Sequence, residues 1–401
     1  MQNRPRTYNS SPLAKSRGGN KYTLSGSAPK PRKKNRGSAL WLRRFIALCV
    51  ALTVIAGVVY LITLIPKREN NAAQRLWFNP TDPSGAFGAD FLFLSGGMLS
   101  CVGVNGELRW QQTLAGANAD FSAESGFVAA WSGRQYMILD SSGKILVSDT
   151  MAGNVQFARV GASYAAALIG EGAAQFILLT DHMGNVIERI EDLDAAFVTD
   201  FGFFDSSDVR LWVLGMDLEG AETKTVFSTY DPRSGRSTGS ADIFDQLIYN
   251  VYKQNKLLML AGTSSLTAYD YNCTQSTAIA SVTAYGWQLA RTRAVRNETY
   301  ALLRKNPQSA DNRMTREFRL VASASDLQLR PPEPCFDGLL GSRGVYLFSA
   351  GKVYSAPYGS AAFTATDLPV QIDSLLCILE GDVAIAASGA EVYILKLPQP
   401  K

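Results

Sequence analysis

The sequence is poor in the residues that most often carry catalysis or bind transition metals. Among 401 residues there is one histidine, His182, and there are five cysteines. A zinc site draws several ligands from His and Cys, and a Ser–His–Asp triad needs a histidine beside its nucleophile. His182 lies in the segment Asp181–Gly184, whose composition is typical of an exposed turn. The sequence therefore assigns no catalytic residue, no cofactor site and no metal site.

Charged residues are also scarce, and their two signs are unevenly distributed. They make up 18% of the chain, and residues 1–44 contain twelve Lys and Arg but no Asp or Glu. Residues 45–401 hold the other 27 basic residues and all 35 acidic ones, a net charge of −8. A nucleic-acid-binding domain presents a basic face. An acidic folded part therefore disfavours nucleic acid as a partner.

A single long apolar stretch follows the basic segment. Residues 45–65, FIALCVALTVIAGVVYLITLI, contain no charged side chain. As a helix they would extend roughly 31 Å, the thickness of the hydrocarbon core of a bilayer. Twelve cations precede the stretch and only Lys67 and Arg68 follow it closely, so the positive-inside bias predicts one transmembrane helix with a cytoplasmic N-terminus. A cleaved signal peptide is disfavoured by the 44 residues that precede the stretch.

The basic segment, residues 1–44, is rich in Ser, Gly, Asn and Pro and is predicted to be a disordered cytoplasmic tail. Its cations near the span have two compatible interpretations. One is contact with anionic lipid headgroups, worth about 1 kcal/mol per cation, and the other is a topology signal alone. The residues concerned are Lys30, Arg32, Lys33, Lys34, Arg36, Arg43 and Arg44. Residues 66–73 are interpreted as a linker and residues 74–401 as one exported domain.

The exported part repeats a unit of short apolar runs separated by turns. In each unit an apolar run ends at Gly, a second run ends in a polar turn, and a third run is more polar. The turns VNG, DSSG, DHMG and DPRSG suit hairpins, because Asp or Asn tolerates the turn and Gly supplies positive φ. Their glycines recur at intervals of 37, 41 and 51 residues, at Gly106, Gly143, Gly184 and Gly235.

This period predicts an all-β fold, an eight-bladed β-propeller. Four-stranded blades take about 40–45 residues, and a ring buries the faces that one blade alone cannot bury. The first unit lacks an obvious inner strand and the last lacks an outer one, so residues 75–78 are expected to pair beside residues 391–397 and close the ring. Seven blades are the alternative, if the loose sixth unit is an insertion. A two-sheet sandwich would not explain why the same order of apolar runs and turns recurs in each unit.

The units resemble blades of the pyrroloquinoline-quinone-type, WD-like propeller superfamily, whose repeat is similar to LYALD-x-x-TG-x-x-x-W. The matching segments are YMILDSSG at 136–143, LTAYD at 266–270, and the turn Asn105–Gly106 followed by Trp110. The whole layout is similar to single-span, propeller-bearing membrane proteins of Clostridia-like bacteria. The resemblance implies a fold and a location but no activity. Quinone dehydrogenases of the superfamily use adjacent cysteines, a calcium site and a Trp platform, and the sequence lacks the adjacent cysteines.

Two further features of the exported part leave alternatives. Aspartates recur at the predicted turns, where capping of the turn backbone is favoured over a ring of calcium ligands; they are Asp140, Asp181, Asp231 and Asp270. Cys335 and Cys377 fall in predicted inner strands of consecutive blades. A disulfide between them is geometrically conceivable, and buried free thiols are the commoner alternative.

The leading hypothesis is a non-enzymatic propeller on the outer side of the cell membrane that binds a protein or a component of the cell envelope. Its other partner would be membrane lipid, reached through the helix and the basic tail. A sensor that binds a small extracellular ligand in the funnel is the second hypothesis, and a divergent propeller enzyme is the third. A funnel lined by convergent carboxylates and arginines would favour these two, whereas an apolar patch on one face would favour a protein partner.

Overall fold

The structure, a computed structural model, describes Cys49, Val50, Thr53, Ala56 and residues 73–401 except 115, 117, 171–173, 196, 205–208, 219–221 and 308–312. The predicted tail 1–44, most of the predicted span 45–65 and linker residues 66–72 lie outside the described residues. The four described residues of the span have helical backbone, and the Thr53 hydroxyl donates to the Cys49 carbonyl at 2.6 Å. Within the part of the chain that is described, no helix is long and apolar enough to cross a membrane.

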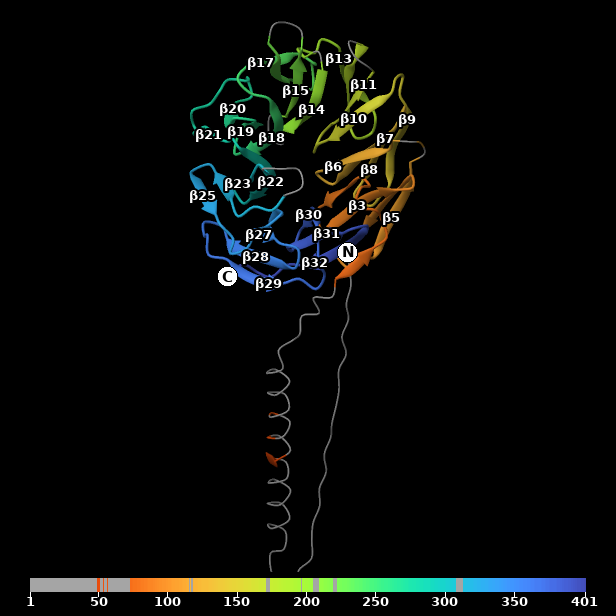
Figure 1. The fold of residues 1–401 in the computed structure, drawn as a ribbon. Helices are drawn as coiled ribbons and strands as arrows, with labels where there is room; N and C mark the ends of the chain where they lie inside the picture. Colours follow the sequence, from red (N-terminus) through yellow and green to blue (C-terminus); the bar gives the residue numbers. More distant parts are fainter. Residues whose placement is uncertain are drawn as a thin grey trace, which may run out of the picture. The chain divides into compact units, whose positions relative to one another are not determined.

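Residues 73–401 form eight four-stranded antiparallel sheets, which Figure 1 shows as the blades of a ring. Blade 1 comprises β2 (Ser84–Phe87), β3 (Asp90–Ser95), β4 (Met98–Val102) and β5 (Leu108–Thr113). Blade 2 comprises β6 (Asp120–Glu124), β7 (Phe127–Ser132), β8 (Gln135–Asp140) and β9 (Ile145–Thr150). Blade 3 comprises β10 (Val155–Val160), β11 (Ala165–Ile169), β12 (Phe176–Thr180) and β13 (Val186–Ile190). Blade 4 comprises β14 (Phe197–Phe204), β15 (Arg210–Asp217), β16 (Lys224–Tyr230) and β17 (Ser237–Ile243).

The second half of the ring has the same plan. Blade 5 comprises β18 (Ile248–Gln254), β19 (Leu257–Gly262), β20 (Ser265–Tyr269) and β21 (Val282–Thr283). Blade 6 comprises β22 (Trp287–Val295), β23 (Glu298–Lys305), β24 (Phe318–Ala322) and β25 (Ser325–Leu329). Blade 7 comprises β26 (Asp337–Leu340), β27 (Gly344–Phe348), β28 (Lys352–Pro357) and β29 (Thr364–Asp367). Blade 8 comprises β30 (Ser374–Leu379), β31 (Val383–Ser388), β32 (Glu391–Lys396) and, from the other end of the chain, β1 (Gln74–Leu76).

Because successive strands of a blade are antiparallel, their turns alternate between the two faces of the ring. The turns that join first to second and third to fourth strands lie on one face, which we call the turn face. The turns that join second to third strands, and the connections between blades, lie on the opposite face, which we call the connection face.

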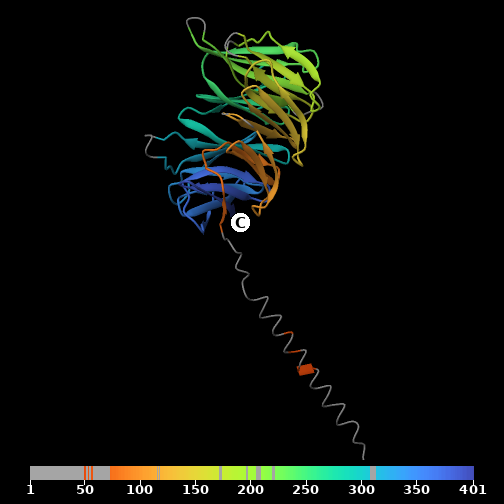
Figure 2. The same cartoon turned by 90° about the vertical axis from the view of Figure 1, so that its right-hand side faces the viewer.

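The ring is closed by pairing of the two ends of the propeller sequence. In β1, Gln74 lies opposite Ile394 and Leu76 opposite Val392 of β32. The inner strands β2 and β30 are also in contact, and Figures 1 and 2 show the first blade (orange) beside the last (blue). The closure predicted from sequence is confirmed, although the paired residues are 74–76 instead of 75–78.

The core is divided into eight apolar layers, and each layer lies between two neighbouring blades. The layer between blades 8 and 1 joins Leu76 and Phe78 to Phe91 and Phe93, with the rings of Phe78 and Phe93 stacked at 4.5 Å. Each blade therefore buries its two faces only against neighbours, which is why the ring needs all of its members.

An outer strand of one blade also covers the turn glycine of the next. A Cβ added at Gly143, where φ is +80°, would lie 2.4 Å from the Trp110 indole. The Trp110 Nε1 donates to the Ser141 carbonyl at 3.2 Å, and Gln112 Nε2 donates to the Gly143 carbonyl at 2.8 Å. The recurring turn glycines are thus required both by backbone conformation and by close contact between blades.

Three details of the sequence-based interpretation are corrected. The first blade does have an inner strand, β2, whose sequence SGAF carries too little apolar pattern to be recognised. The loose sixth unit is a complete blade, so the seven-bladed alternative is wrong. Cys377 lies in the inner strand β30, but Cys335 lies before β26, in an isolated bridge with Thr315, and both are free thiols.

Candidate protein-binding surface

The headgroup or topology cations predicted from sequence lie outside the described residues: Lys30, Arg32, Lys33, Lys34, Arg36, Arg43 and Arg44. The recurring turn aspartates are described, and they cap their own turns as expected. One carboxylate oxygen of each accepts the backbone N–H two residues later, at 2.8, 2.8, 3.1 and 2.9 Å for Asp140, Asp181, Asp231 and Asp270. Across the described residues, no three His, Cys, Asp or Glu side chains gather as a metal site would need.

The one histidine and one serine motif are placed in structural roles. The His182 ring stacks on Phe127 at 3.7 Å between centroids, and its Nε2 lies 2.9 Å from the Gly161 carbonyl oxygen. Residues Gly235–Gly239 have the spacing G-x-S-x-G, which the sequence interpretation overlooked. Ser237 begins the outer strand β17 after a hairpin turn, whereas a nucleophile elbow requires a turn from a strand into a helix.

Two arginines of the inner strands pair with carboxylates on inner strands of neighbouring blades. Arg159 of β10 lies 2.7 Å from Asp200 of β14, and Arg291 of β22 lies 3.4 Å from Asp337 of β26. Arg291 also donates to the Leu375 carbonyl of β30 at 3.2 Å. These partly exposed pairs are neutral overall, and each links the inner strands of two neighbouring blades. They tie strands together instead of converging on a space that a ligand would occupy.

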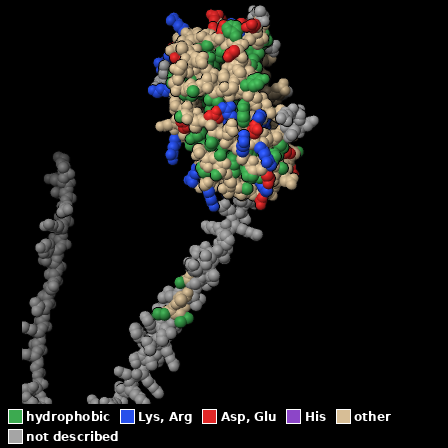
Figure 3. Space-filling model, turned by 60° about the vertical axis from the view of Figure 1, so that its left-hand side comes forward, with side chains coloured by type: hydrophobic (Ala, Val, Ile, Leu, Met, Phe, Trp, Pro, Cys, Tyr) green, Lys and Arg blue, Asp and Glu red, His purple; other side chains and the backbone are tan. Residues whose placement is uncertain are grey.

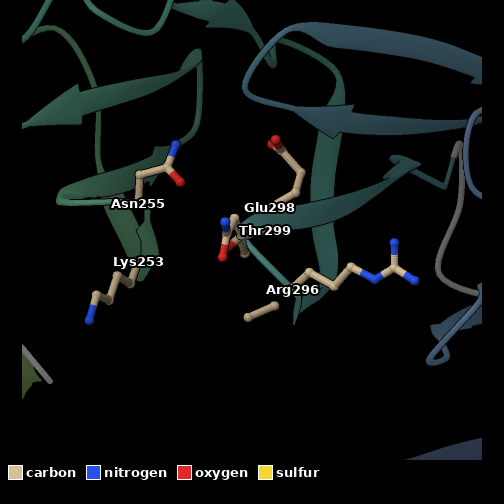
Figure 4. Close-up of a pocket in the computed structure, with 7 residues that line it drawn as sticks. Lys253, Asn255, Arg296, Glu298 and Thr299 are labelled. Carbon is tan, nitrogen blue, oxygen red and sulfur yellow. The ribbon is translucent and has the colours of Figure 1, made fainter.

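Two shallow grooves flank the β22–β23 turn on the turn face. The groove between blades 5 and 6 has a volume of about 340 Å³, and the one between blades 6 and 7 about 450 Å³. Figure 4 shows Lys253 and Arg296 pointing away from each other in the first groove, with the Glu298 carboxylate directed away from both. Glu298 is also occupied within the fold, because it accepts from Gln254 Nε2 and from the Ser323 backbone N–H, both at 2.6 Å.

The connection face of blades 4–6 has a different character, because apolar side chains gather on it. Each residue lies in a connection between strands or within the first residues of an inner strand, and each is between 40% and 81% exposed. They are Phe197, Leu218, Phe244, Leu247, Tyr249, Tyr285 and Met314, which we call the connection patch. Isolated exposed apolar residues are ordinary, but several on one face of neighbouring blades mark an interaction surface.

The centre of the connection patch is held by a partly buried polar anchor, Gln246. Gln246 lies between Phe244 and Leu247 in the connection from β17 to β18. Its Oε1 accepts the Ser265 backbone N–H at 2.9 Å, and its Nε2 donates to the Ser265 hydroxyl at 2.8 Å. A Cβ at Gly262 would meet the Gln246 amide at 2.0 Å, so glycine makes room for this anchor. The anchor holds the connection with its apolar side chains toward solvent.

Ion pairing borders the same surface on blade 4. Lys224 lies 2.7 Å from Asp242 and 3.5 Å from Asp217, and its Nζ lies 5.9 Å from the centre of the Phe244 ring. The hydrogen bond to Asp242, aided by the charge of Asp217, raises the pKa of Lys224 above its usual value. Lys224 therefore stays charged at neutral pH and contacts an aromatic ring at the edge of the patch.

Elsewhere the charges of the propeller are dispersed. In Figure 3, acidic and basic side chains on the visible side are interspersed among uncharged ones, so the side shown has no large field of one sign. This arrangement gives no support to a polyanion such as nucleic acid as a ligand of that side.

Comparison with solved structures establishes the fold class. The C-terminal WD40 domain of Sif2 matches with a TM-score of 0.56 at 11% identity, covering 82% of this chain and 99% of that one. Sqt1 from Saccharomyces cerevisiae gives 0.55 at 8% identity, covering 82% and 100%. BamB from Moraxella catarrhalis gives 0.50 at 10% identity, covering 82% and 99%. The chain has the fold of a β-propeller with eight blades, and it is similar in fold to these proteins.

At these identities the likeness extends to the fold alone. It confirms the predicted resemblance to quinone-type and WD-like propellers at that level, and the likeness to single-span membrane proteins stays a prediction. No protein-family model matches the chain, and no curated protein matches it in sequence.

Proposed function

We propose that this protein is a membrane-anchored, non-enzymatic β-propeller whose connection patch binds another protein or a component of the cell envelope outside the cell. The observation that carries the proposal is the gathering of seven exposed apolar side chains on one face of blades 4–6. Eight blades that bury their faces against one another make a rigid disk, which is typical of protein-binding scaffolds. Such a patch gains free energy when a partner covers it.

Membrane anchoring is supported by the sequence of the N-terminal part. Residues 45–65 are uncharged and long enough for one span, and twelve cations lie before them. The same arrangement supports a cytoplasmic N-terminus and an extracytoplasmic propeller in the cell membrane. The cations nearest the span then face the inner leaflet, where anionic headgroups attract them.

The chain enters and leaves the propeller on the turn face. The Gln74 side chain lies over Gly106 in the β4–β5 turn, and the Leu397 N–H donates to the Asp382 carbonyl in the β30–β31 turn at 3.0 Å. Neither end of the propeller sequence therefore covers the connection face, and this supports that face as the one that meets a partner.

The sensor hypothesis has weaker support. Two described arginines of the inner strands, Arg159 and Arg291, pair with carboxylates of neighbouring inner strands, and the side chains of the groove in Figure 4 diverge. A small-ligand site instead brings a few polar groups together around one enclosed space.

The proposal is tested by site-specific photo-crosslinking in intact cells. A photoreactive amino acid replaces Leu247 in the connection patch and, as the matched control, Ile145 on the turn face, which is 41% exposed, as Leu247 is. We expect a discrete crosslinked species from position 247 and none from position 145. Accessibility of the C-terminus to protease added outside the cells checks the topology. Equal crosslinking at both positions, or a protected C-terminus, would refute the proposal.

A further inference from the structure

The blade 4 end of the connection patch is bordered mainly by carboxylates. Among the described residues, four acidic residues and one basic residue lie in the strand ends and connections of this region, a net charge of −3: Asp217, Glu222, Asp242, Asp245 and Lys224. Lys224 is shared by Asp242 and Asp217. Glu222 and Asp245 are exposed, and neither has a basic partner among the described residues. Two negative charges thus lie next to apolar surface without local neutralisation.

The carboxylates are interleaved with the apolar residues along the chain. Glu222 belongs to the β15–β16 connection that begins with Leu218, and Asp245 follows Phe244 directly. The Phe244 ring has the Lys224 ammonium 5.9 Å from its centre, an arrangement in which an aromatic ring attracts a cation. A partner that covers only the apolar atoms would desolvate these carboxylates without compensation. A partner with Lys or Arg beside its apolar side chains would avoid that cost.

We infer that the blade 4 end of the connection patch binds a cationic, amphipathic segment of a protein partner. This inference rests on the proposed function and specifies the chemistry of the partner. Apolar side chains of the segment pack against Leu218, Phe244 and Leu247. Its Lys or Arg side chains pair with the carboxylates of Glu222 and Asp245, which steer the approach and fix its register.

A binding assay with a defined probe tests the inference. The full chain is placed in nanodiscs of zwitterionic lipid, and the probe is a short fluorescent peptide with Lys and Leu at helical spacing. A Glu–Leu peptide and a Lys–Ser peptide of the same length are the controls for charge and for apolarity, and empty nanodiscs control for lipid. We expect the Lys–Leu peptide to bind measurably tighter than either control peptide, with an affinity that falls as salt rises.

Matched variants locate the site. Asp245→Lys should weaken binding of the Lys–Leu peptide about three- to tenfold, since it reverses one rim charge. Phe244→Ser should weaken it about tenfold, because it removes an aromatic anchor. Glu380→Lys makes the same charge change in the β30–β31 turn, on the turn face, and should leave the affinity unchanged. Thermal unfolding of each variant separates loss of binding from loss of folding. Equal binding of the Glu–Leu peptide, or an unchanged affinity in Asp245→Lys, would overturn the inference.

Capture of the partner and deletion of the tail show whether the inference and the proposed function stand or fall together. If the crosslink at Leu247 captures a partner in cells and the crosslinked segment is acidic, the partner chemistry inferred here is wrong while the scaffold function stands. If deletion of residues 1–44 strengthens peptide binding, the chain's own basic tail is the occupant, which overturns both the inference and the proposed topology. If the captured segment is basic and apolar, the inference is supported.

Discussion

The contact between Trp110 and Gly143 provides a quantitative test of how neighbouring blades are held together. In Gly143→Ala, the new methyl group meets the indole, since its Cβ would lie 2.4 Å from the ring, and the backbone must hold an alanine at φ +80°. Left-handed backbone costs a non-glycine residue about 1–2 kcal/mol, and forcing a methyl group into a filled space costs about 1–3 kcal/mol. We expect the free energy of unfolding to fall by about 2–5 kcal/mol, the sum of the two terms.

Two comparisons divide this loss into its parts. Gly126→Ala has nearly the same backbone angle, +83°, but its Cβ would meet nothing within 4 Å, so it should lose only about 1–2 kcal/mol. In a Trp110→Ala background the indole is removed, but the Cβ of residue 110 still lies 2.9 Å from the new methyl group. Gly143→Ala should then cost less than it does beside the indole, although more than Gly126→Ala. Chemical denaturation followed by far-ultraviolet circular dichroism measures all four variants. A Gly143→Ala effect that is the same with and without Trp110 would refute the packing argument.

Three other outcomes follow from the structure. Leu76→Ala should destabilise the ring by about 2–5 kcal/mol, because its buried side chain joins blade 8 to blade 1, whereas Arg75→Ala, which breaks only an exposed ion pair, should change little in the same denaturation series. Hydrogen bonds from the Asn185 side chain and from the turn backbone lower the pKa of Asp181. The stability this carboxylate provides is therefore present above its unfolded pKa of about 4 and is lost as pH falls through its folded pKa. In an Asp181→Asn variant the free energy of unfolding should therefore decrease less steeply as the pH is lowered. Burial raises the pKa of Cys273 to about 11 and of Cys335 to about 12, so both should resist iodoacetamide at mildly alkaline pH until denaturant is added; rapid labelling of the native protein would contradict this.

The sequence allowed prediction of the fold because the blade signal is local. Each turn of the type Asp140–Gly143 combines a capping carboxylate with a glycine at positive φ, and both features act within four residues. Blade count and ring closure followed from the spacing of these turns and from the incomplete last unit. The strand β2 was missed because antiparallel pairing with β3, and not apolar alternation, holds the sequence SGAF in place.

The connection patch could not be predicted in the same way. Phe197, Phe244 and Tyr285 stand in or next to connections between blades, 47 and 41 residues apart, and each is ordinary in its own segment. They share a face only because the antiparallel blades return every between-blade connection to the same side of the ring. The group Phe244–Tyr249 was the one local sign, since three exposed apolar residues there surround the partly buried Gln246 anchor. The predicted lipid-facing cations stay a prediction.

The pairing of β1 with β32, which closes the ring, can form only at the end of synthesis. Gln74 is made early and its pairing partner Ile394 is made roughly 320 residues later, so the first strand must wait, unpaired, while seven blades assemble behind it. Contacts of such long sequence separation form late and slow the overall reaction. If synthesis stops before the last hairpin, the product is an incomplete propeller whose first strand has an unpaired edge. Cellular proteases and chaperones readily distinguish such a species from the closed ring.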